Sequence, residues 1–440
     1  MSELLDIAKG AIKLAMDKGA QEASAGTYRS REVEITWRDG KVEKVSEATT
    51  RGLSISLYVD GRYSSVSTSD LRPEALSKFV EESIAMARTL AKDPFRKLPD
   101  PKLYEGRANV DLELADAKYQ EVTPEKRREL AAALEAAARS VKGKGEILSV
   151  ETSVSDSRSE SARATSNGFV GENAGTSFWL GAGATVKDPD GRRPEGSSFG
   201  GSRFFAEIPD AETIGRQGAQ RAFDCVGAAK APSANVPIVV ENRVAGRLVR
   251  SLFGPLGARS LQQKQSFLEG QLGKPIASKL LTVTDDPLIK RGFGSRLYDS
   301  EGIAAKKMVV VEAGVLKTYY VDDYYGRKLK MAPTTGGSSN LIFALGKKSF
   351  DELVKDVKDG IYVTGFLGGN SNSTTGDYSF GIQGFRIEKG AITSPIAEMN
   401  ISGNQKDLWK NLVALGNDPY PYTSTNTPTM VFDGVSVAGA

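Results

Sequence analysis

The sequence predicts an α+β protein, with N-terminal segments that combine helices and antiparallel sheets and a β-rich C-terminal domain with a short helix. Segments of alternating apolar and polar residues are joined by Asp-Gly or Asn-Gly pairs, which favour hairpins. Other segments repeat apolar residues at the spacing of one helical face. A glycine-rich, strand-like region occupies much of the C-terminal half. Hairpins join antiparallel strands, and this gives the predicted class.

The chain has 440 residues, a length that suggests two or three domains. Proline and small residues interrupt the periodic segments at 91–122 and again at 227–235, so we place the boundaries there. The expected units are an N-terminal α+β segment (1–96), a middle α+β segment (120–230) and a β-rich C-terminal domain (231–440).

The N-terminal segment is predicted to begin and end with a helix. Residues 3–18 place apolar side chains in one wide stripe, and residues 73–90 do the same. Between these helices, alternating segments flank Asp39-Gly40 and Asp60-Gly61, and such pairs supply the positive φ that tight hairpins need. The pattern predicts a meander of antiparallel strands.

The middle segment combines the same kinds of element. Thr123 caps a predicted helix that has Pro124 at its first position. Strand-like runs follow, and Asn167-Gly168 is predicted to join two of them as a hairpin. A last helix over 211–226 carries Cys225, which we interpret as a small buried hydrophobic residue.

The C-terminal domain is predicted to begin with a buried strand and a short helix. The strand, 236–240, is mostly β-branched, and Asn242 is a reasonable N-cap for the helix. Apolar side chains then share one face of this helix, whereas Arg243, Arg247 and Arg250 share another.

Composition excludes several classes of function. The net charge of +3 gives no overall field that favours nucleic acid or a membrane surface. No apolar run approaches the roughly 20 residues that span a bilayer, and the N-terminus resembles an amphipathic helix more than a signal peptide. One cysteine excludes an intramolecular disulfide and agrees with a reducing compartment. We therefore expect a cytoplasmic protein.

The sequence contains no histidine, which rules out Ser-His, Cys-His and His-metal sites within this chain. One G-x-S-x-G match occurs at 196–200, and we interpret it as a loop because no convincing strand leads into it. The acidic clusters at 188–191 and 285–286 have turn chemistry and miss the spacing of a calcium loop.

Residues 236–257, with the G-D-Y-S-F-G motif at 376–381, resemble the TldD/PmbA protease family, whose active members carry His-Glu-x-x-x-His on the helix after this strand. The resemblance places the first histidine on Arg250, the glutamate on Ser251 and the second histidine on Pro255. Arginine stays protonated and has no lone pair to offer a metal, and proline has no side-chain donor atom. The third ligand of active members, a cysteine near the C-terminus, corresponds to YTSTNTP at 422–428, which contains no cysteine.

The resemblance therefore implies the TldE type: a non-catalytic subunit whose short helix is a pseudo-active-site helix. It implies no metal or cofactor in this chain, zinc in a TldD-type catalytic partner, and a peptide substrate. It also implies roles in maturing a peptide antibiotic and effects on DNA gyrase. As candidates for lining a substrate chamber we name four polar residues of the glycine-rich region, which could instead satisfy turn backbone: Asp377, Tyr378, Ser379 and Gln383.

Two other functions stay open. The chain could be a protein-binding regulator of DNA gyrase or a related partner without protease activity, and near-neutral charge argues against direct nucleic-acid contact. The third hypothesis is a hydrolase that acts alone through an unrecognised carboxylate site. Whether the chain forms a homodimer when alone does not follow from the sequence.

Overall fold

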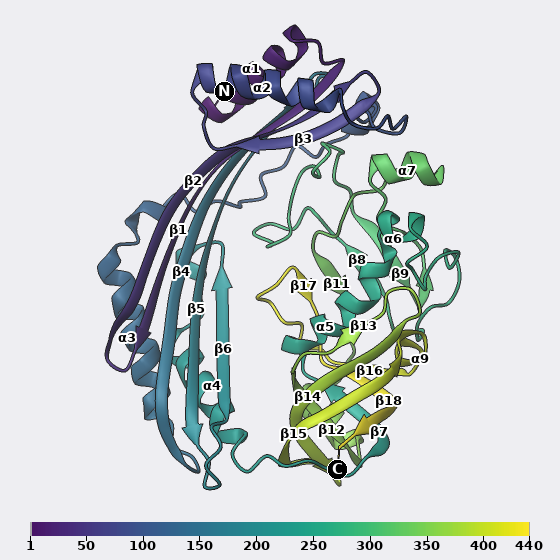
Figure 1. Ribbon diagram of the computed structural model, residues 1–440. Coiled ribbons are helices and arrows are strands. Elements are labelled where there is room, and N and C mark those ends of the chain that lie inside the picture. The colour runs from purple at the N-terminus through teal and green to yellow at the C-terminus, as the bar shows by residue number, and fades with distance from the viewer. Residues whose placement is uncertain (1, 440) are drawn as a thin grey trace.

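Hairpin turns and one long-range pairing build a six-stranded antiparallel sheet in the computed structural model, which describes residues 2–439 (Figure 1). Asp39-Gly40 and Asp60-Gly61 adopt positive φ at both positions, as the sequence predicts for tight hairpins. The strand order is β3-β2-β1-β4-β5-β6. The strands are β1 (Glu22–Arg38), β2 (Lys41–Val59), β3 (Arg62–Thr68), β4 (Glu146–Thr165), β5 (Val170–Lys187) and β6 (Glu195–Ser202).

The pairing of β1 with β4 joins the N-terminal and middle segments. Ser24 lies opposite Thr165 at one end of the pair, and Arg38 lies opposite Glu151 at the other. The two segments therefore contribute to one continuous sheet. The division of the chain into units 1–96, 120–230 and 231–440 stays a prediction.

Four helices cover one face of this sheet. Ala164 of β4 packs with α1 and α2, and Val154 of the same strand packs with α3 and α4. These two residues are an even number of positions apart, so the helices lie on the same face. Figure 1 shows α3 on the outer side of the curved sheet and the C-terminal domain on the other side. The helices are α1 (Glu3–Asp17), α2 (Pro73–Ala87), α3 (Pro124–Ser140) and α4 (Ala211–Asp224).

The opposite face of the sheet is open and polar. Along β4, Thr152, Val154 and Asp156 are buried under the helices, and the intervening Ser153 and Ser155 are only half-buried. Asp156 is held by the guanidinium of Arg127 on α3, at 2.6 Å between Oδ2 and Nε. The inner face therefore presents small polar side chains toward the C-terminal domain.

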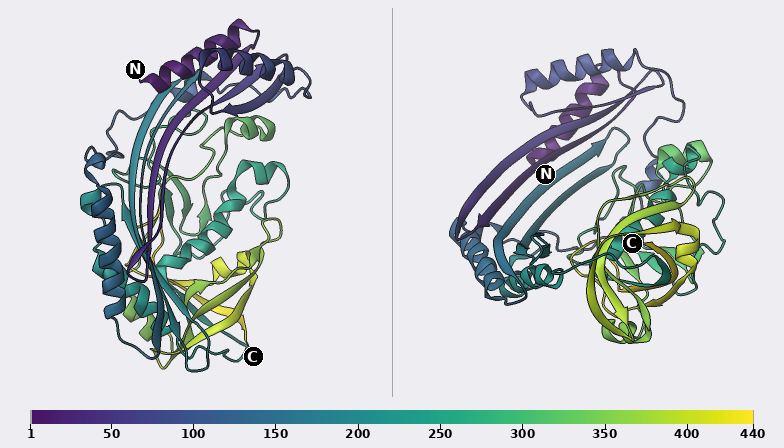
Figure 2. Two further views of the ribbon diagram at one scale, coloured as in Figure 1. Left: turned by 60° about the vertical axis from the view of Figure 1, so that its left-hand side comes forward. Right: turned by 60° about the horizontal axis from the view of Figure 1, so that its bottom comes forward.

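The C-terminal domain contains two further sheets, seen from three directions in Figures 1 and 2. The seven-stranded sheet comprises β7 (Ala234–Val240), β12 (Asp359–Phe366), β13 (Asn370–Ser371), β14 (Asp377–Glu388), β15 (Ala391–Asn404), β16 (Leu412–Leu415) and β18 (Met430–Ala438). The five-stranded sheet comprises β8 (Val283–Asp285), β9 (Met308–Glu312), β10 (Val315–Leu316), β11 (Leu341–Phe343) and β17 (Thr425–Asn426). This mixture of helices and mostly antiparallel sheets confirms the predicted α+β class.

Short helices complete the chain. In the C-terminal domain they are α5 (Asn242–Phe253), the 3₁₀ turn η4 (Gly254–Leu256), α6 (Ala258–Gln262), α7 (Asp323–Leu329), α8 (Phe350–Asp356) and α9 (Gln405–Lys410). Three other 3₁₀ turns precede it: η1 (Pro101–Tyr104), η2 (Tyr119–Glu121) and η3 (Phe205–Glu207). No helix between residues 2 and 439 combines the length and apolar character needed to cross a bilayer.

Two local predictions are wrong. The 196–200 match lies within strand β6 and not in a loop. Its run of glycine and serine lacks the apolar alternation that marks a strand, yet Gly196 lets α4 approach the sheet closely. The N-cap of α5 is Glu241 and not Asn242, whose side-chain amide instead donates to the carbonyl oxygen of Asp418.

The segment between α2 and α3 attaches the C-terminal domain to the long sheet. Arg327 of α7 donates hydrogen bonds to the carbonyl oxygens of Phe95, Lys97 and Leu98. The hydroxyl of Tyr324, also on α7, donates to Asp93 at 2.7 Å. The linker is therefore an ordered strap between the two parts of the molecule.

Candidate functional site

Helix α5 forms one wall of a cavity because its two faces differ sharply. The apolar face packs into the core through Ala245, Leu248, Val249, Leu252 and Phe253. Arg243, Arg247 and Arg250 share the opposite face, which we call the basic face of α5. Strand β7 runs directly into this helix and fixes its start at the edge of the buried sheet.

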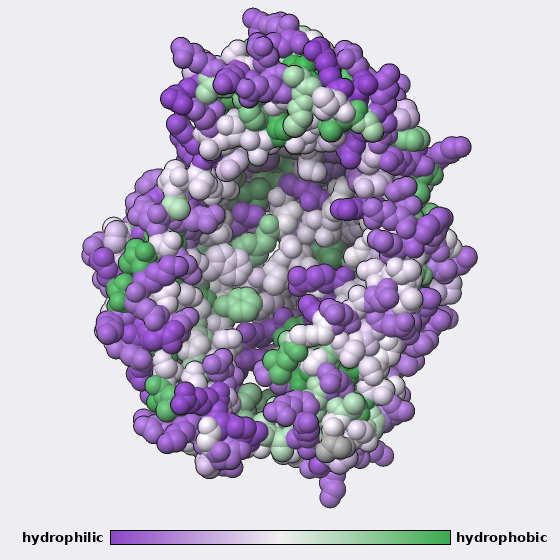
Figure 3. Space-filling view, viewed as in Figure 1, coloured by the Kyte–Doolittle hydropathy of each residue, from purple (hydrophilic) through white to green (hydrophobic). Residues whose placement is uncertain are grey.

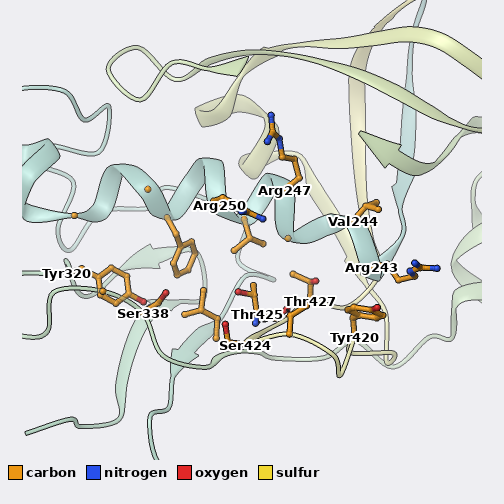
Figure 4. A pocket seen from close by; sticks show the side chains of 18 of the residues that line it. Arg243, Val244, Arg247, Arg250, Tyr320, Ser338, Tyr420, Ser424, Thr425 and Thr427 are labelled. Carbon is orange, nitrogen blue, oxygen red and sulfur yellow. Dashed lines mark hydrogen bonds between the residues drawn. The ribbon is translucent and has the colours of Figure 1, made fainter. Parts of the chain in front are cut away.

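The cavity beside α5 has a volume of about 740 Å³. Its second wall comes from two loops distant in sequence, 336–338 and 423–427, and from Tyr320 and Tyr420. Figure 4 shows the three arginines along the helix and the side chains of Tyr320, Ser338, Ser424, Thr425, Thr427 and Tyr420 in a row beside it. Each side chain in this row carries a hydroxyl group.

A second cavity of about 680 Å³ extends from the first toward the inner face of the long sheet. The two share Arg243, Val244 and Phe366 in their linings. The second is also lined by Glu151 of β4 and Ser197 of β6. Figure 3 shows the molecule hollowed between the long sheet and the C-terminal domain. The two cavities are therefore neighbours, with these three residues between them.

Arg243 lies where the two cavities meet. Its guanidinium donates to the carbonyl oxygen of Ser197 at 3.3 Å and lies 5.5 Å from the ring centre of Phe199. Burial lowers the pKa of Arg243 below its usual value, and the positive charge of Arg221 adds to this. The side chain still stays protonated near neutral pH, because arginine titrates far above it.

The other two arginines extend the positive charge along the helix. Arg247 donates to the carbonyl oxygen of Gly369 at 2.8 Å and lies over the ring of Phe380. Arg250 is exposed to the cavity. Within the part of the chain that the structure describes, the lining of the first cavity includes no aspartate or glutamate.

The residues at the family's metal positions do not fit zinc. Arg250 faces the cavity with a cation, Ser251 donates its hydroxyl to the carbonyl oxygen of Arg247, and Pro255 is buried in η4. The segment 422–428, predicted to correspond to the third ligand, contributes Thr423, Ser424, Thr425 and Thr427 to the same cavity. The structure thus brings both regions together without an imidazole, thiolate or carboxylate among the lining residues, and zinc in proteins requires such donors.

The four candidate substrate residues do not lie together. Gln383 lines the second cavity, whereas Asp377, Tyr378 and Ser379 are absent from the linings of both cavities. Asp377 accepts hydrogen bonds from Thr375 and Asn404. Tyr378 is buried and stacks on Phe380 in the core. Ser379 is exposed on β14. Their role in substrate binding stays a prediction.

The family motif covers Arg250 but assigns no function to Arg243 or Arg247. The spacing of the arginines in the sequence could have indicated a shared role, because residues at positions i, i+4 and i+7 lie on one helical face. No acidic residue lies three or four positions from any of them, so no ion pair within the helix could neutralise them. The three guanidinium groups therefore have no ion-pair partner on their own helix.

Cys225 is half-buried and lines the second cavity. Burial raises the pKa of its thiol above the usual value. A thiol with a raised pKa is a poor nucleophile at neutral pH. Cys225 therefore contributes to the wall of the cavity without any sign of activation.

Comparison with known proteins shows matches along the chain. Three family models match: PmbA/TldA metallopeptidase domain 1 at 24–87, the central domain at 117–225 and the C-terminal domain at 233–439. Metalloprotease PmbA of Escherichia coli O157:H7 is 28% identical over 98% of this chain and 94% of its own length.

Solved structures agree with this result. A protein of Bacteroides thetaiotaomicron proposed to be a modulator of DNA gyrase is 39% identical, with a TM-score of 0.96 and full coverage of both chains. TldE of Thermococcus kodakarensis shares the fold, with a TM-score of 0.86 over 98% of this chain and 100% of its own at 21% identity. The chain belongs to the PmbA/TldD family of metalloprotease-like proteins, some of whose members are named modulators of DNA gyrase.

Proposed function

We propose that this chain is the non-catalytic, TldE-type subunit of a two-chain metalloprotease that processes or degrades peptides. In this proposal a TldD-type partner supplies the zinc and the reacting groups, and the present chain helps to enclose the substrate. The observation that carries the proposal is the donor set of the first cavity. Arg250, Ser251 and Pro255 stand where active members place their metal-binding motif, and none of them can hold zinc.

The shape of the molecule supports a role in holding peptide. Two neighbouring cavities lie between α5 and the open polar face of the long sheet. An extended peptide can be held by hydrogen bonds between its main chain and a strand, a mode that tolerates many sequences. Such a binding surface would help a subunit that handles unfolded peptide without performing the chemistry.

The proposal is tested by reconstitution with a TldD-type chain. Each purified chain and their mixture are assayed for cleavage of an internally quenched peptide, with and without EDTA, and their zinc is measured. We expect stoichiometric zinc in the partner alone, no cleavage by the present chain, and EDTA-sensitive cleavage by the mixture. Cleavage by the isolated chain that EDTA leaves unchanged would show that the subunit proposal is wrong.

A second candidate function follows from the name of the solved relative from Bacteroides thetaiotaomicron, which is proposed to be a modulator of DNA gyrase. The chain would then act as a protein-binding regulator without protease activity. Affinity purification from lysate separates the two functions. An equimolar zinc-containing homologue among the bound proteins supports the protease subunit, and gyrase without such a homologue supports the regulator.

We also infer a cytoplasmic location, since a single cysteine agrees with a reducing compartment. Homodimer formation by the isolated chain is tested by light scattering before the TldD-type chain is added. A homodimer that dissociates as the mixed complex forms would support the two-chain assembly.

A further inference from the structure

The first cavity concentrates positive charge that the chain itself does not neutralise. Glu241, the acidic residue at the start of α5, is already bound by the guanidinium of Arg221 at 2.6 Å. Arg243 contacts the carbonyl oxygen of Ser197 and the hydroxyl of Tyr420, and Arg247 donates to the carbonyl oxygen of Gly369. Each guanidinium carries five N–H donors, so both leave donors for a ligand. An anion in this cavity would form charge-assisted hydrogen bonds, which are stronger than neutral ones.

The arginines are spread along the helix and do not converge on one point. Figure 4 shows the side chain of Arg247 pointing away from Arg243, with Arg250 further along the helix. Arg243 donates to the carbonyl oxygen of Ser197 and Arg247 to that of Gly369, so their guanidinium groups point to different parts of the cavity wall. A ligand with separated carboxylates therefore fits this arrangement better than one compact anion does.

The remaining lining suits a peptide. Val244, Phe253, Leu341 and Phe366 supply apolar surface between the charged groups. Ser424 and Thr425 line the other wall, and their hydroxyls can hydrogen-bond to main-chain groups, whereas the hydroxyl of Thr427 donates to the carbonyl oxygen of Asn242. A ligand with alternating carboxylate and apolar groups would use both kinds of surface.

We propose that the basic face of α5 binds the carboxylates of an extended acidic peptide and so selects peptide substrates by charge. This inference rests on the proposed peptide-binding role of the chain. The carboxylates can belong to acidic side chains or to the C-terminus of the peptide.

Binding of three fluorescein-labelled heptapeptides to the purified full chain tests the proposal by fluorescence anisotropy. The first contains Glu-x-Glu and has an amidated C-terminus, the second contains Gln-x-Gln and is also amidated, and the third is the Gln peptide with a free carboxylate. We expect the Glu peptide to bind at least roughly tenfold more tightly than the amidated Gln peptide, with a preference that weakens in high salt. A third peptide that equals the first shows that a C-terminal carboxylate is bound as well as acidic side chains, and one that equals the second shows that only acidic side chains are bound.

Single substitutions locate the site. Arg247→Gln and Arg250→Gln are each expected to weaken binding of the Glu peptide by roughly threefold to tenfold. Arg259→Gln is the matched control, because Arg259 is an exposed arginine on α6 that does not line the cavity. Unchanged denaturation curves establish that the variants fold. Equal binding of the Glu and Gln peptides, or equal effects of the three substitutions, would overturn the proposal.

A single-stranded oligonucleotide serves as a second probe. If it binds more tightly than the Glu peptide and loses affinity in the same arginine variants, the site binds nucleic acid and the proposal is wrong. Reconstitution separates this inference from the proposed function. A chain that supports cleavage by the TldD-type partner but shows no charge preference overturns the carboxylate site alone. A chain that prefers the Glu peptide but never supports cleavage overturns the subunit proposal alone.

Discussion

Arg221 of α4 grips the carboxylate of Glu241 with two hydrogen bonds, 2.7 Å from Nη1 to Oε1 and 2.6 Å from Nη2 to Oε2. Glu241 immediately precedes α5, so the pair ties the helix layer of the long sheet to the wall of the first cavity. Glu241 is the acidic residue nearest in sequence to the basic face of α5, and its carboxylate is already paired with Arg221. The Arg221–Glu241 pair thus fixes the start of α5, and it leaves the arginines of the basic face without this carboxylate as an ion-pair partner.

Arg221→Ala is expected to lower the free energy of unfolding by about 2 kcal/mol, because it leaves the buried Glu241 carboxylate without its partner. Arg216→Ala is the control on the same helix, since Arg216 pairs with Glu212 where both side chains are more than half exposed. That control should change stability by less than about 0.5 kcal/mol. Denaturant unfolding measures both, and equal losses would contradict the role given to Arg221.

Gly196→Ala is expected to destabilise the packing of α4 on β6. An added Cβ would lie 2.1 Å from the backbone nitrogen of Ala222, so the helix would have to move. Overpacking of this kind costs about 1–3 kcal/mol. Gly183→Ala, in the neighbouring strand, places its Cβ 3.8 Å from the nearest atom and should be tolerated. Thermal denaturation compares them, and an unchanged melting temperature for the first variant would contradict the close approach.

The stability of the protein should depend on pH through Glu301. Burial raises the pKa of Glu301 to about 7, and the negative charges of Asp322 and Asp299 add to the rise, while Arg327 and Arg163 oppose it. The carboxyl group of an unfolded chain titrates near 4.5. Between these values the folded chain holds a proton that the unfolded chain releases, so stability falls as the pH rises from about 4.5 to 7.

The loss amounts to at most about 3 kcal/mol, and Glu301→Gln should remove it, because an amide keeps the neutral form at every pH. The variant is therefore expected to be more stable than the parent above pH 7 and to have a flatter stability profile. Glu105→Gln, at an exposed position, is the control. Denaturant midpoints between pH 5 and 8 provide the measurement. A parent profile that rises through this range in step with the Glu301→Gln profile would refute the assignment.

The candidate substrate residues can be separated by kinetics. Gln383 lines the second cavity and Ser379 lines neither, so Gln383→Ala should raise the KM of the reconstituted protease roughly twofold to tenfold, and Ser379→Ala should leave it unchanged. The kcat should stay the same in both cases if, as proposed, the reacting groups belong to a TldD-type partner. Equal effects of both substitutions would place the substrate on β14 outside the cavities.

Local rules predict much of this fold. The positive φ angles at Asp39-Gly40 and the helix over residues 3–17 follow from chemistry within a few residues. The pairing of β1 with β4 has no such signal, because the partners are far apart in sequence and many strands have suitable alternation. Strand β6 was missed for a related reason: glycine and serine have little strand preference, and packing against α4 selects them.

The site was partly predictable. The resemblance placed Arg250, Ser251 and Pro255 on a helix and marked 422–428 as a related segment, but only the folded chain shows that Arg250 and the hydroxyls of 423–427 line one cavity. The roles of Asp377 and Gln383 could not be separated by alternation along the strand. Asp377 and Gln383 lie on the same face of β14, but they are six positions apart along the strand, and of the two only Gln383 reaches the second cavity.

The pairing of β1 with β4 also affects the order in which the long sheet can form during synthesis. During synthesis, β1 pairs early with β2, but its other edge has no neighbour until the ribosome has made residues up to Thr165. An open strand edge of this length invites pairing with other chains, and a contact so distant in sequence forms slowly. The edge of β1 is therefore exposed to other chains until β4 pairs with it, and the open edge then passes to β4 until β5 is made.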